Sequence, residues 1–307
     1  MISVLIATKE RPDSLLVCLQ SIVSNQFTQY EVIVIDQSNV VSALIKQYLK
    51  KHHRIHFYHL PNRGRERGKS YALQQGLMKA KGEIIAFTDD DCIVDKKWLK
   101  ILWQGFAQNK CDGLFGQVLP YQPAQHADET CPCTMRFAKK EFVRQPRYHV
   151  SIGYGNNMAF RKQALDEIGS PKTWLGPGSI GSNAEDAELT LRALFAKKII
   201  LRYPKSIVYH NRWLNAQEMK EQQLSYTQGE AACYGYFSFL GSNFCKQILI
   251  RGIKANLQNL KRNLLSVFSF NKGKRTRNNV YWNFRSLLAS ARGLSVGFWF
   301  FLTESLK

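Results

Sequence analysis

The sequence predicts an α/β fold in which a mixed, mainly parallel sheet carries helices on both faces and is followed by a basic helical region. Short apolar runs alternate with amphipathic stretches through residues 1–119. Several of these runs end in carboxylates, most sharply in residues 83–91, where Phe87 and Thr88 lead into three aspartates. The charge balance is strongly basic, with 43 Lys and Arg residues against 23 Asp and Glu, for a net charge of +20.

Four apolar runs predict buried parallel strands, because they are short and apolar on both faces: residues 2–7, 30–36, 55–60 and 83–89. Apolar residues recur at helical spacing after Pro12, which suits a first helical turn, and again in residues 40–49 and 70–80. Residues 98–106 predict a further helix and 113–119 a further strand. This alternation is expected of parallel strands joined by crossover helices.

Beyond Pro120 the regular alternation stops, and residues 120–150 show no clear period. Order returns in residues 153–161, in a helix over 185–197 and in one or two short strands over 199–210. From residue 214 onward the chain has the pattern of basic helices. We therefore expect an α/β domain over 1–213, with halves 1–119 and 120–213, and a helical region over 214–307.

The end of this helical region concentrates the positive charge. Residues 241–307 contain twelve Lys and Arg residues and one acid, Glu304, and an apolar stripe runs from Ile248 to Phe268. Such a pattern suits helices lying on an anionic membrane surface. The alternative is a helical cap packed on the α/β domain, with its charge in water. The most apolar run, residues 294–302, is shorter than the ~18–20 residues of a spanning helix, so we expect none.

Composition also narrows the partners and the compartment. A charge of +20 implies an anionic partner such as nucleic acid, a nucleotide or an acidic membrane. The seven cysteines are scattered, and the one close pair, Cys131 and Cys133, lacks a second pair for a zinc site. Met1 leads directly into a strand, so we expect no signal peptide and a cytoplasmic protein with reduced thiols.

The three aspartates 89–91 are the first candidate site. Like charges at the tip of a buried strand repel, and either water at a solvated turn or a divalent cation relieves that repulsion. Ligands bind at the carboxyl ends of strands in open α/β sheets. The position therefore favours a cation held by carboxylates, with room for phosphate oxygens.

Further polar residues follow other predicted strands or open a helix. Asp36 closes the second strand, either as a turn residue or as part of a site at the same edge. Glu185 and Asp186 open a helix, where acids are stabilised by the helix dipole, or where one acts as a general base. His210 follows an apolar run; a lone His is usually a packing residue, but imidazole also suits Mn²⁺ beside carboxylates.

The residues around Lys69 resemble the end of a phosphate-binding loop. Gly68, Lys69 and Ser70 fit that motif, but Arg63 stands where its first glycine is required. The helix that begins here nevertheless offers an anion site at its N-terminus. Lys69 is therefore a candidate phosphate contact.

Taken together, these motifs resemble the family 2 glycosyltransferases of the GT-A fold. The matching segments are residues 4–11 at the first strand and residues 32–36 at the second strand. The later ones are residues 62–64, 70–76, 86–91, 155–161, 185–189 and 208–210. They occur in the family's order and cover residues 1–213. One departure is Leu73-Gln74, where many relatives have Arg-Asn.

The resemblance implies a role for each matching position. Thr8, Arg11, Asp36, Gly64, Lys69 and Asp90 would bind the nucleotide. Asp89 and Asp91 would be the paired carboxylates, at least one of which binds a divalent metal, Mn²⁺ or Mg²⁺, on the diphosphate, and His210 would be a further contact to the metal or the diphosphate. Asp186 would be the catalytic base, with Glu185 beside it. Residues 170–184 would form a flexible loop on the acceptor side.

The expected activity is an inverting, metal-dependent transfer of a sugar from a nucleotide-diphosphate sugar. The acceptor would be a hydroxyl of a glycan or lipid-linked molecule in surface polysaccharide synthesis, at the inner face of the cytoplasmic membrane. A nucleotidyltransferase shares the acidic strand end and is the first alternative. A basic nucleic-acid-binding protein is the second; the cations gather in the tail rather than among exposed aromatics, so we expect no nucleic-acid partner.

Overall fold

The computed structural model describes residues 1–64, 67–124, 126–148, 151–267 and 274–305. The chain forms two compact units, the first comprising Met1–Thr173 with Glu185–Asn215, and the second Trp174–Ala184 with Ala216–Lys307. This division lies close to the expected one at residue 213. It differs in placing Trp174–Ala184 with the helices rather than with the α/β domain.

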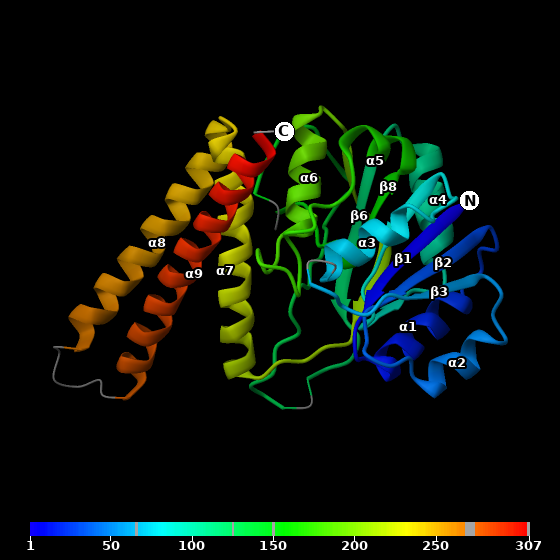
Figure 1. The fold of residues 1–307 in the computed structure, drawn as a ribbon, viewed down its shortest axis with the longest axis horizontal. Coiled ribbons are helices and arrows are strands. Elements are labelled where there is room, and N and C mark those ends of the chain that lie inside the picture. Colours follow the sequence, from blue (N-terminus) through cyan, green and yellow to red (C-terminus); the bar gives the residue numbers. More distant parts are fainter. Residues whose placement is uncertain (65–66, 125, 149–150, 268–273, 306–307) are drawn as a thin grey trace. The chain divides into compact units, whose positions relative to one another are not determined.

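The first unit is built on one nine-stranded sheet with the order β3-β2-β1-β4-β8-β6-β9-β5, and β7 pairs with β9 (Figure 1). Its strands are β1 (Ile2–Thr8), β2 (Tyr30–Asp36), β3 (Ile55–His59), β4 (Ile84–Phe87), β5 (Cys92–Val94), β6 (Gly113–Pro120), β7 (Glu141–Val143), β8 (Met158–Arg161) and β9 (Ile200–His210). The first four strands are parallel, as are β6 and β9, whereas β5, β7 and β8 run antiparallel to their neighbours. The expected mixed, mainly parallel sheet is confirmed.

Helices cover both faces of this sheet, which explains why β1, β2 and β4 are buried along nearly their whole length. Successive side chains of a strand point to opposite faces, so Val32 and Val34 join one core cluster while Ile33 and Ile35 join the other. The helices are α1 (Pro12–Val23), α2 (Ala43–Leu49), α3 (Lys69–Leu77), α4 (Trp98–Gln108), α5 (Lys162–Ile168) and α6 (Glu185–Phe195). Residues of α1, α2 and α4 pack into the first cluster, and residues of α3, α5 and α6 into the second.

A buried amide ties the middle of the sheet together. Asn157, fully buried, accepts a hydrogen bond from Trp98 Nε1 at 3.0 Å and one from Ser206 Oγ at 3.1 Å. Its Nδ2 donates to the carbonyl of Gln117 at 2.7 Å and lies 3.3 Å from that of Ser206. Asn157, which belongs to the 155–161 motif and ends the 3-10 turn η2 (Gly155–Asn157) just before β8, therefore joins this turn to α4, β6 and β9.

We expect Asn157→Ala to lower the free energy of unfolding by about 3 kcal/mol, because it leaves several buried polar partners unsatisfied. Urea denaturation followed by circular dichroism measures the change. Asn39→Ala, at an exposed loop position, is the matched control and should shift stability by less than about 0.5 kcal/mol. Equal stabilities of the two variants would show that the buried network contributes little.

The second unit consists of α7 (Ala216–Phe239), α8 (Asn243–Val267), α9 (Lys274–Ser305) and Trp174–Ala184. Within this unit the three helices lie side by side (Figure 1). A Cβ atom added at Gly293 would lie 2.1 Å from the backbone oxygen of Gln228, and one at Gly297 would lie 2.4 Å from that of Ala232. Small residues therefore permit close approach of α9 to α7.

Trp174 anchors its segment to these helices. Its ring stacks on Phe300 at 4.7 Å between centroids, and its Nε1 donates to Glu304 Oε1 at 3.3 Å. Ser182 and Asn183 both hydrogen-bond to Ser225. The segment expected to be a flexible loop is thus held in place by contacts within the helical unit.

Within the described residues, one stretch of α9, Asn278–Glu304, is long and apolar enough to cross a membrane by length and composition. The expectation of no spanning helix rested on the short apolar run at 294–302, which Ser295 and Gly297 interrupt. Because α9 is one continuous helix, its apolar character extends over more residues. A core helix of a soluble protein can meet the same criterion.

Candidate active site

Carboxylates gather at one edge of the sheet, where β1, β2, β4 and β9 end. Thr8 and Asp36 are paired in register at the ends of β1 and β2, and the three aspartates follow β4 immediately. We call Asp36, Asp89, Asp90, Asp91, Glu185 and Asp186 the acid edge. The carboxyl ends of strands are the usual place for a ligand in this architecture.

Asp90 is the buried member of the three adjacent aspartates. Thr8 Oγ1 donates a hydrogen bond to Asp90 Oδ2 at 2.7 Å, and Arg11 Nη1 lies 3.2 Å from Oδ1. Burial, followed by the nearby charge of Asp91, raises the pKa of Asp90 to about 6, against the opposing effects of Thr8 and Arg11. The structure therefore brings together three residues expected to bind the nucleotide.

Asp91 forms an ion-paired group with His210 and Arg11. His210 Nε2 lies 3.3 Å from Asp91 Oδ1, and Arg11 Nη1 lies 3.1 Å from Oδ2. Burial alone would raise the pKa of Asp91, but the hydrogen bond and charge of His210, with Arg11, lower it well below its ordinary range. Burial alone would lower the pKa of His210, but Asp91 and its other hydrogen-bond partners raise it to about 10.

The other side of His210 is held by a segment whose role was not evident from the sequence. Its Nδ1 lies 2.7 Å from the backbone carbonyl of Pro132 and therefore donates to it, which directs Nε2 toward Asp91. Cys131 Sγ also approaches the carbonyl of His210, at 3.5 Å. The close cysteine pair thus flanks a carbonyl that orients the imidazole.

Lys69, at the start of α3, connects the strand end to the opposite side of the acid edge. Its Nζ lies 2.6 Å from Asp89 Oδ1 and 3.1 Å from Glu185 Oε1. Burial would lower the pKa of Lys69, but Asp89 and Glu185 raise it well above its ordinary value, so the side chain is a cation. The sequence indicated Lys69 as a phosphate contact but not this bridge.

Glu185 and Asp186 are held in different ways. Glu185 is buried and pairs with Lys69, whereas Asp186 is partly exposed and accepts backbone hydrogen bonds from Gly155 and Ala187, both at 2.8 Å. Burial raises the pKa of both carboxyls, and Lys69 partly offsets the effect. Asp186 therefore combines a fixed orientation, exposure and raised basicity, which a general base requires.

Two further expected site residues show mainly turn geometry. Asp36 Oδ1 accepts a hydrogen bond from the backbone N–H of Ser38 at 2.9 Å and one from its hydroxyl, which is the turn role considered for it. Its second oxygen is not used in these bonds. Gly64 has φ +53°, and a Cβ added there would meet nothing within 4 Å. Gly64 therefore fits a turn, and its expected nucleotide contact stays a prediction.

The donor set fits a divalent metal at one end of the acid edge. Among the described residues, ligand atoms of Asp91, Cys92 and His210 lie within 4.8 Å of one another. Burial raises the pKa of the Cys92 thiol well above its ordinary value, which disfavours the ligating thiolate. Carboxylate suits Mn²⁺ or Mg²⁺ and neutral imidazole suits Mn²⁺, so a metal here would replace the proton that His210 Nε2 carries toward Asp91. A His that donates its other N–H to a carbonyl is typical of a metal ligand. Asp89 instead pairs with Lys69.

A family model described as "Glycosyl transferase family 2" matches residues 3–169, more than half of the 307 residues. Among curated proteins, the chain is similar to Glycosyltransferase GlyG of Streptococcus pneumoniae serotype 4 (strain ATCC BAA-334 / TIGR4), with 24% identity over 123 residues. That match covers 39% of this chain and 40% of the relative. It therefore spans less than half of that protein's length.

Solved structures match over nearly the whole chain. The mannosyltransferase PcManGT from Pyrobaculum calidifontis, in complex with GDP-Man and Mn²⁺, has a TM-score of 0.60 and 14% identity, covering 95% of this chain and 86% of that one. S. aureus TarS 1-349, in complex with UDP-GlcNAc, has a TM-score of 0.59 and 15% identity, covering 96% and 89%. At this identity the likeness shows the fold, and the expected GT-A fold is confirmed.

Proposed function

Because the chain belongs to glycosyl transferase family 2 and is a glycosyltransferase, we propose that it transfers a sugar from a nucleoside diphosphate donor with inversion. The observation that carries this proposal is the acid edge itself. A candidate metal pair, Asp91 and His210, and a candidate base, Asp186, belong to one cluster that Lys69 spans from Asp89 to Glu185. Family membership favours this reading over nucleotidyl transfer and nucleic-acid binding.

The residues have separable tasks in this reaction. Thr8, Arg11 and Asp90 form one connected group at the end of β1, where we place the nucleoside, together with Asp36 and Gly64. Asp91 and His210, joined by Asp89, would hold the divalent cation. That cation, when bound, neutralises charge on the departing diphosphate. PcManGT was solved with GDP-Man and Mn²⁺, which supports the binding of a nucleotide sugar and of a divalent cation.

Asp186 removes the proton from the acceptor hydroxyl. The freed oxygen attacks the anomeric carbon from the face opposite the diphosphate, so one displacement inverts the anomeric centre. Lys69 offers its ammonium to the developing negative charge on the diphosphate, which is where a fixed cation lowers the barrier most. The acceptor in our proposal is a glycan or lipid-linked hydroxyl in surface polysaccharide synthesis.

A panel of UDP-, GDP- and other nucleotide sugars, with Mn²⁺ or Mg²⁺, tests the proposed activity. The expected result is thermal stabilisation by one donor class and slow release of a nucleoside diphosphate. Release of pyrophosphate from a nucleoside triphosphate and sugar phosphate would instead indicate nucleotidyl transfer. Stabilisation by none of the donors, with or without metal, would contradict the proposal.

We further propose that the helical unit places the enzyme on the anionic inner face of the cytoplasmic membrane. Helix α8 contains no Asp or Glu, and its cations are exposed: Lys246, Arg251, Lys254, Lys261 and Arg262. Ile250, Leu257 and Leu264 follow one another every seven residues, so they share a face, and they are 39%, 49% and 43% exposed. An exposed apolar stripe beside cations is typical of helices bound at lipid surfaces.

Helix α9 of the same unit also carries exposed aromatic residues, namely Tyr281, Phe284, Phe298 and Trp299. Tyrosine and tryptophan are favoured where lipid meets water. Of the other cations of the expected basic tail, Lys272 and Lys307 are outside the described residues. The side chains of Lys274, Arg275 and Arg277 are outside them as well.

Replacing Arg251, Lys254 and Lys261 together with glutamate is expected to weaken binding to vesicles containing phosphatidylserine by at least about 100-fold. Each cation near such a surface contributes about 1 kcal/mol. Co-sedimentation with vesicles at low and high salt measures it. Glutamates at Lys46, Lys50 and Lys51, which are exposed on and beside α2, are the matched control. A salt-dependent surface contact would be contradicted if the α8 variant bound vesicles as wild type does. It would also be contradicted if high salt failed to release the wild-type protein from the vesicles and only detergent did so.

A further inference from the structure

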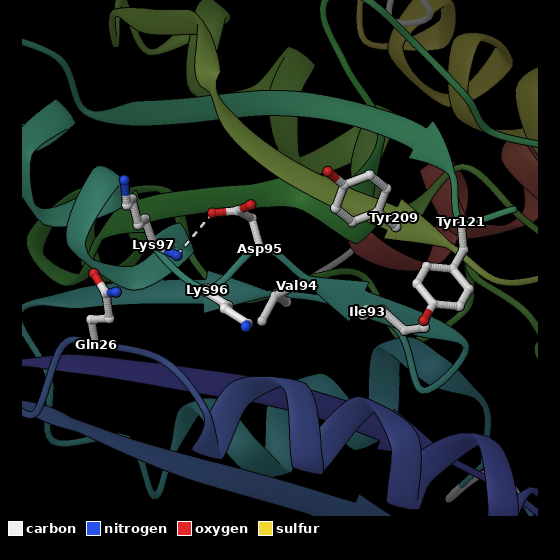
Figure 2. A pocket seen from close by; sticks show the side chains of 8 residues that line it. All are labelled: Gln26, Ile93, Val94, Asp95, Lys96, Lys97, Tyr121 and Tyr209. Atoms are coloured by element: carbon white, nitrogen blue, oxygen red, sulfur yellow. Dashed lines mark hydrogen bonds between the residues drawn. The ribbon is translucent and has the colours of Figure 1, made fainter.

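An open hollow of about 430 Å³ lies in the first unit along the edge strand β5, and none of the residues that line it belongs to the acid edge (Figure 2). Tyr121 and Tyr209 line one end, and Gln26 and Lys97 line the other. None of these residues is among the proposed donor-binding or catalytic residues. The mixture of aromatic, amide and ammonium groups in an open depression suits a hydrophilic ligand with apolar faces.

The aromatic end is formed by Tyr209 of β9 and by Tyr121, which immediately follows β6. The rings of Tyr121 and Tyr209 lie 6.3 Å apart at an angle of 70°, and Tyr121 is 42% exposed. Within the described residues, neither phenol hydroxyl forms a hydrogen bond. A tyrosine offers an apolar ring and a polar tip, and a sugar ring likewise presents C–H groups on one face and hydroxyls at its rim.

The other end is cationic. Lys96 and Lys97 are exposed, and in the described part of the chain neither ammonium forms an ion pair. Asp95, the acid beside them, is committed to the turn before α4: its Oδ1 accepts the backbone N–H of Lys97 at 2.8 Å (Figure 2). With two ammonium groups against one carboxylate, this end of the hollow keeps a net positive charge for an anionic group on the ligand.

The hollow begins next to the proposed metal site. Tyr209 immediately precedes His210 and pairs in register with Ile93, just as His210 pairs with Cys92. Since neighbouring residues of a strand point to opposite faces, Tyr209 faces the hollow while His210 faces the acid edge. From Asp91 to Lys96 the chain advances five residues, of which Cys92–Val94 form β5, so the two positions lie at most about 17 Å apart.

We propose that this hollow binds an anionic glycan, with sugar rings against Tyr121 and Tyr209 and phosphate or carboxylate substituents at Lys96 and Lys97. The inference rests on the proposed function in one respect: the bound glycan is the acceptor chain, held several units behind the hydroxyl that receives the new sugar. Such a second contact raises the effective concentration of the accepting end at the catalytic edge. The enzyme would thus favour extended acidic acceptors over single sugars.

The test is a glycan array printed with neutral, uronic-acid-containing and phosphate-containing oligosaccharides, probed with the full-length protein and its variants. Wild type should bind acidic members. Tyr121→Ala should weaken binding about tenfold, as expected for an aromatic anchor, and Tyr121→Phe should retain most of it. Lys96→Ala and Lys97→Ala should remove the preference for acidic over neutral glycans. Phe142→Ala and Lys50→Ala, also at exposed positions, should bind as wild type does.

Thermal stabilisation by nucleotide sugars, measured on the same variants, separates the two proposals. We expect it to be unchanged, because the hollow contains no donor-binding residue. The glycan site would be overturned if wild type bound nothing on the array. It would also be overturned if the double variant Tyr121→Ala, Lys97→Ala bound as well as wild type. Loss of donor stabilisation in Tyr121→Ala would overturn it as well, by placing the hollow in the donor pocket. Glycan binding without stabilisation by any nucleotide sugar would contradict the proposed activity and leave the site standing.

Discussion

Asp186→Asn is expected to bind the nucleotide-sugar donor as wild type does and to lose sugar transfer by about 10²–10⁴-fold in kcat. The substitution preserves the size of the side chain and an oxygen to accept a backbone N–H from Gly155 or Ala187. It removes the carboxylate that takes the acceptor's proton. Donor affinity is measured by calorimetry in the presence of Mn²⁺, and transfer by release of the nucleoside diphosphate with acceptor present.

The geometry explains why Asp186 rather than its neighbour is expected to be the base. One oxygen of Glu185 lies 3.1 Å from Lys69 Nζ, and the side chain is buried. Each Asp186 oxygen accepts a single backbone N–H, so lone pairs remain to receive a proton. Burial also raises the pKa of Asp186, which moves the acid limb of the kcat profile above the ordinary aspartate value of about 3.9.

Glu185→Gln is the matched control, because it makes the same chemical change one residue away. We expect it to retain substantially more transfer activity than Asp186→Asn. Its loss of charge acts mainly on Lys69 and on stability. Full activity of Asp186→Asn would refute the assignment, and full activity together with an inactive Glu185→Gln would transfer the role of base to Glu185.

The first half of the fold was predictable because its information is local. A buried parallel strand is largely apolar on both faces, and the interiors of β1, β2 and β4 satisfy this except at Ser3 and Glu31, which hydrogen-bond to each other. Strands β5 and β7 have three residues each, which is too short for a period to be visible. The grouping of Trp174–Ala184 with α7 and α9 rests on contacts such as Trp174 with Phe300, which no local pattern indicates.

The candidate site was predictable in its residues but not in its connections. Asp89, Asp90 and Asp91 are adjacent in sequence, yet Asp89 pairs with Lys69, Asp90 with Thr8, and Asp91 with His210. These partners come from three different elements far away in the chain, so only the folded sheet assigns them. The motifs therefore indicated the residues of the candidate site, whereas the folded structure showed how they pair: Thr8 with Asp90, His210 with Asp91, and Lys69 between Asp89 and Glu185.

Lys69→Met is expected to change metal binding and catalysis in opposite directions. With the ammonium 2.6 Å from Asp89 removed, the acid edge gains a net negative charge, and Mn²⁺ should bind in the absence of nucleotide at least about tenfold more tightly. Transfer should nevertheless fall by about 10²-fold, because the diphosphate loses a fixed cation as its charge develops. Electron paramagnetic resonance of free Mn²⁺ measures the first effect, and product release measures the second.

The opposite signs distinguish this role from a purely structural one. Unfolding or loosening of the site would weaken metal binding and transfer together. Lys69→Arg, which keeps the charge, should bind Mn²⁺ as weakly as wild type does. Lys79→Met, just beyond the other end of α3, where the ammonium lies 4.3 Å from the ring centroid of Tyr58, removes an equal charge without touching the acid edge and should change neither quantity. Unaltered Mn²⁺ affinity in Lys69→Met would show that Lys69 does not compete with the metal for Asp89. In that case, the Lys69–Asp89 ion pair would not have to break when the metal binds.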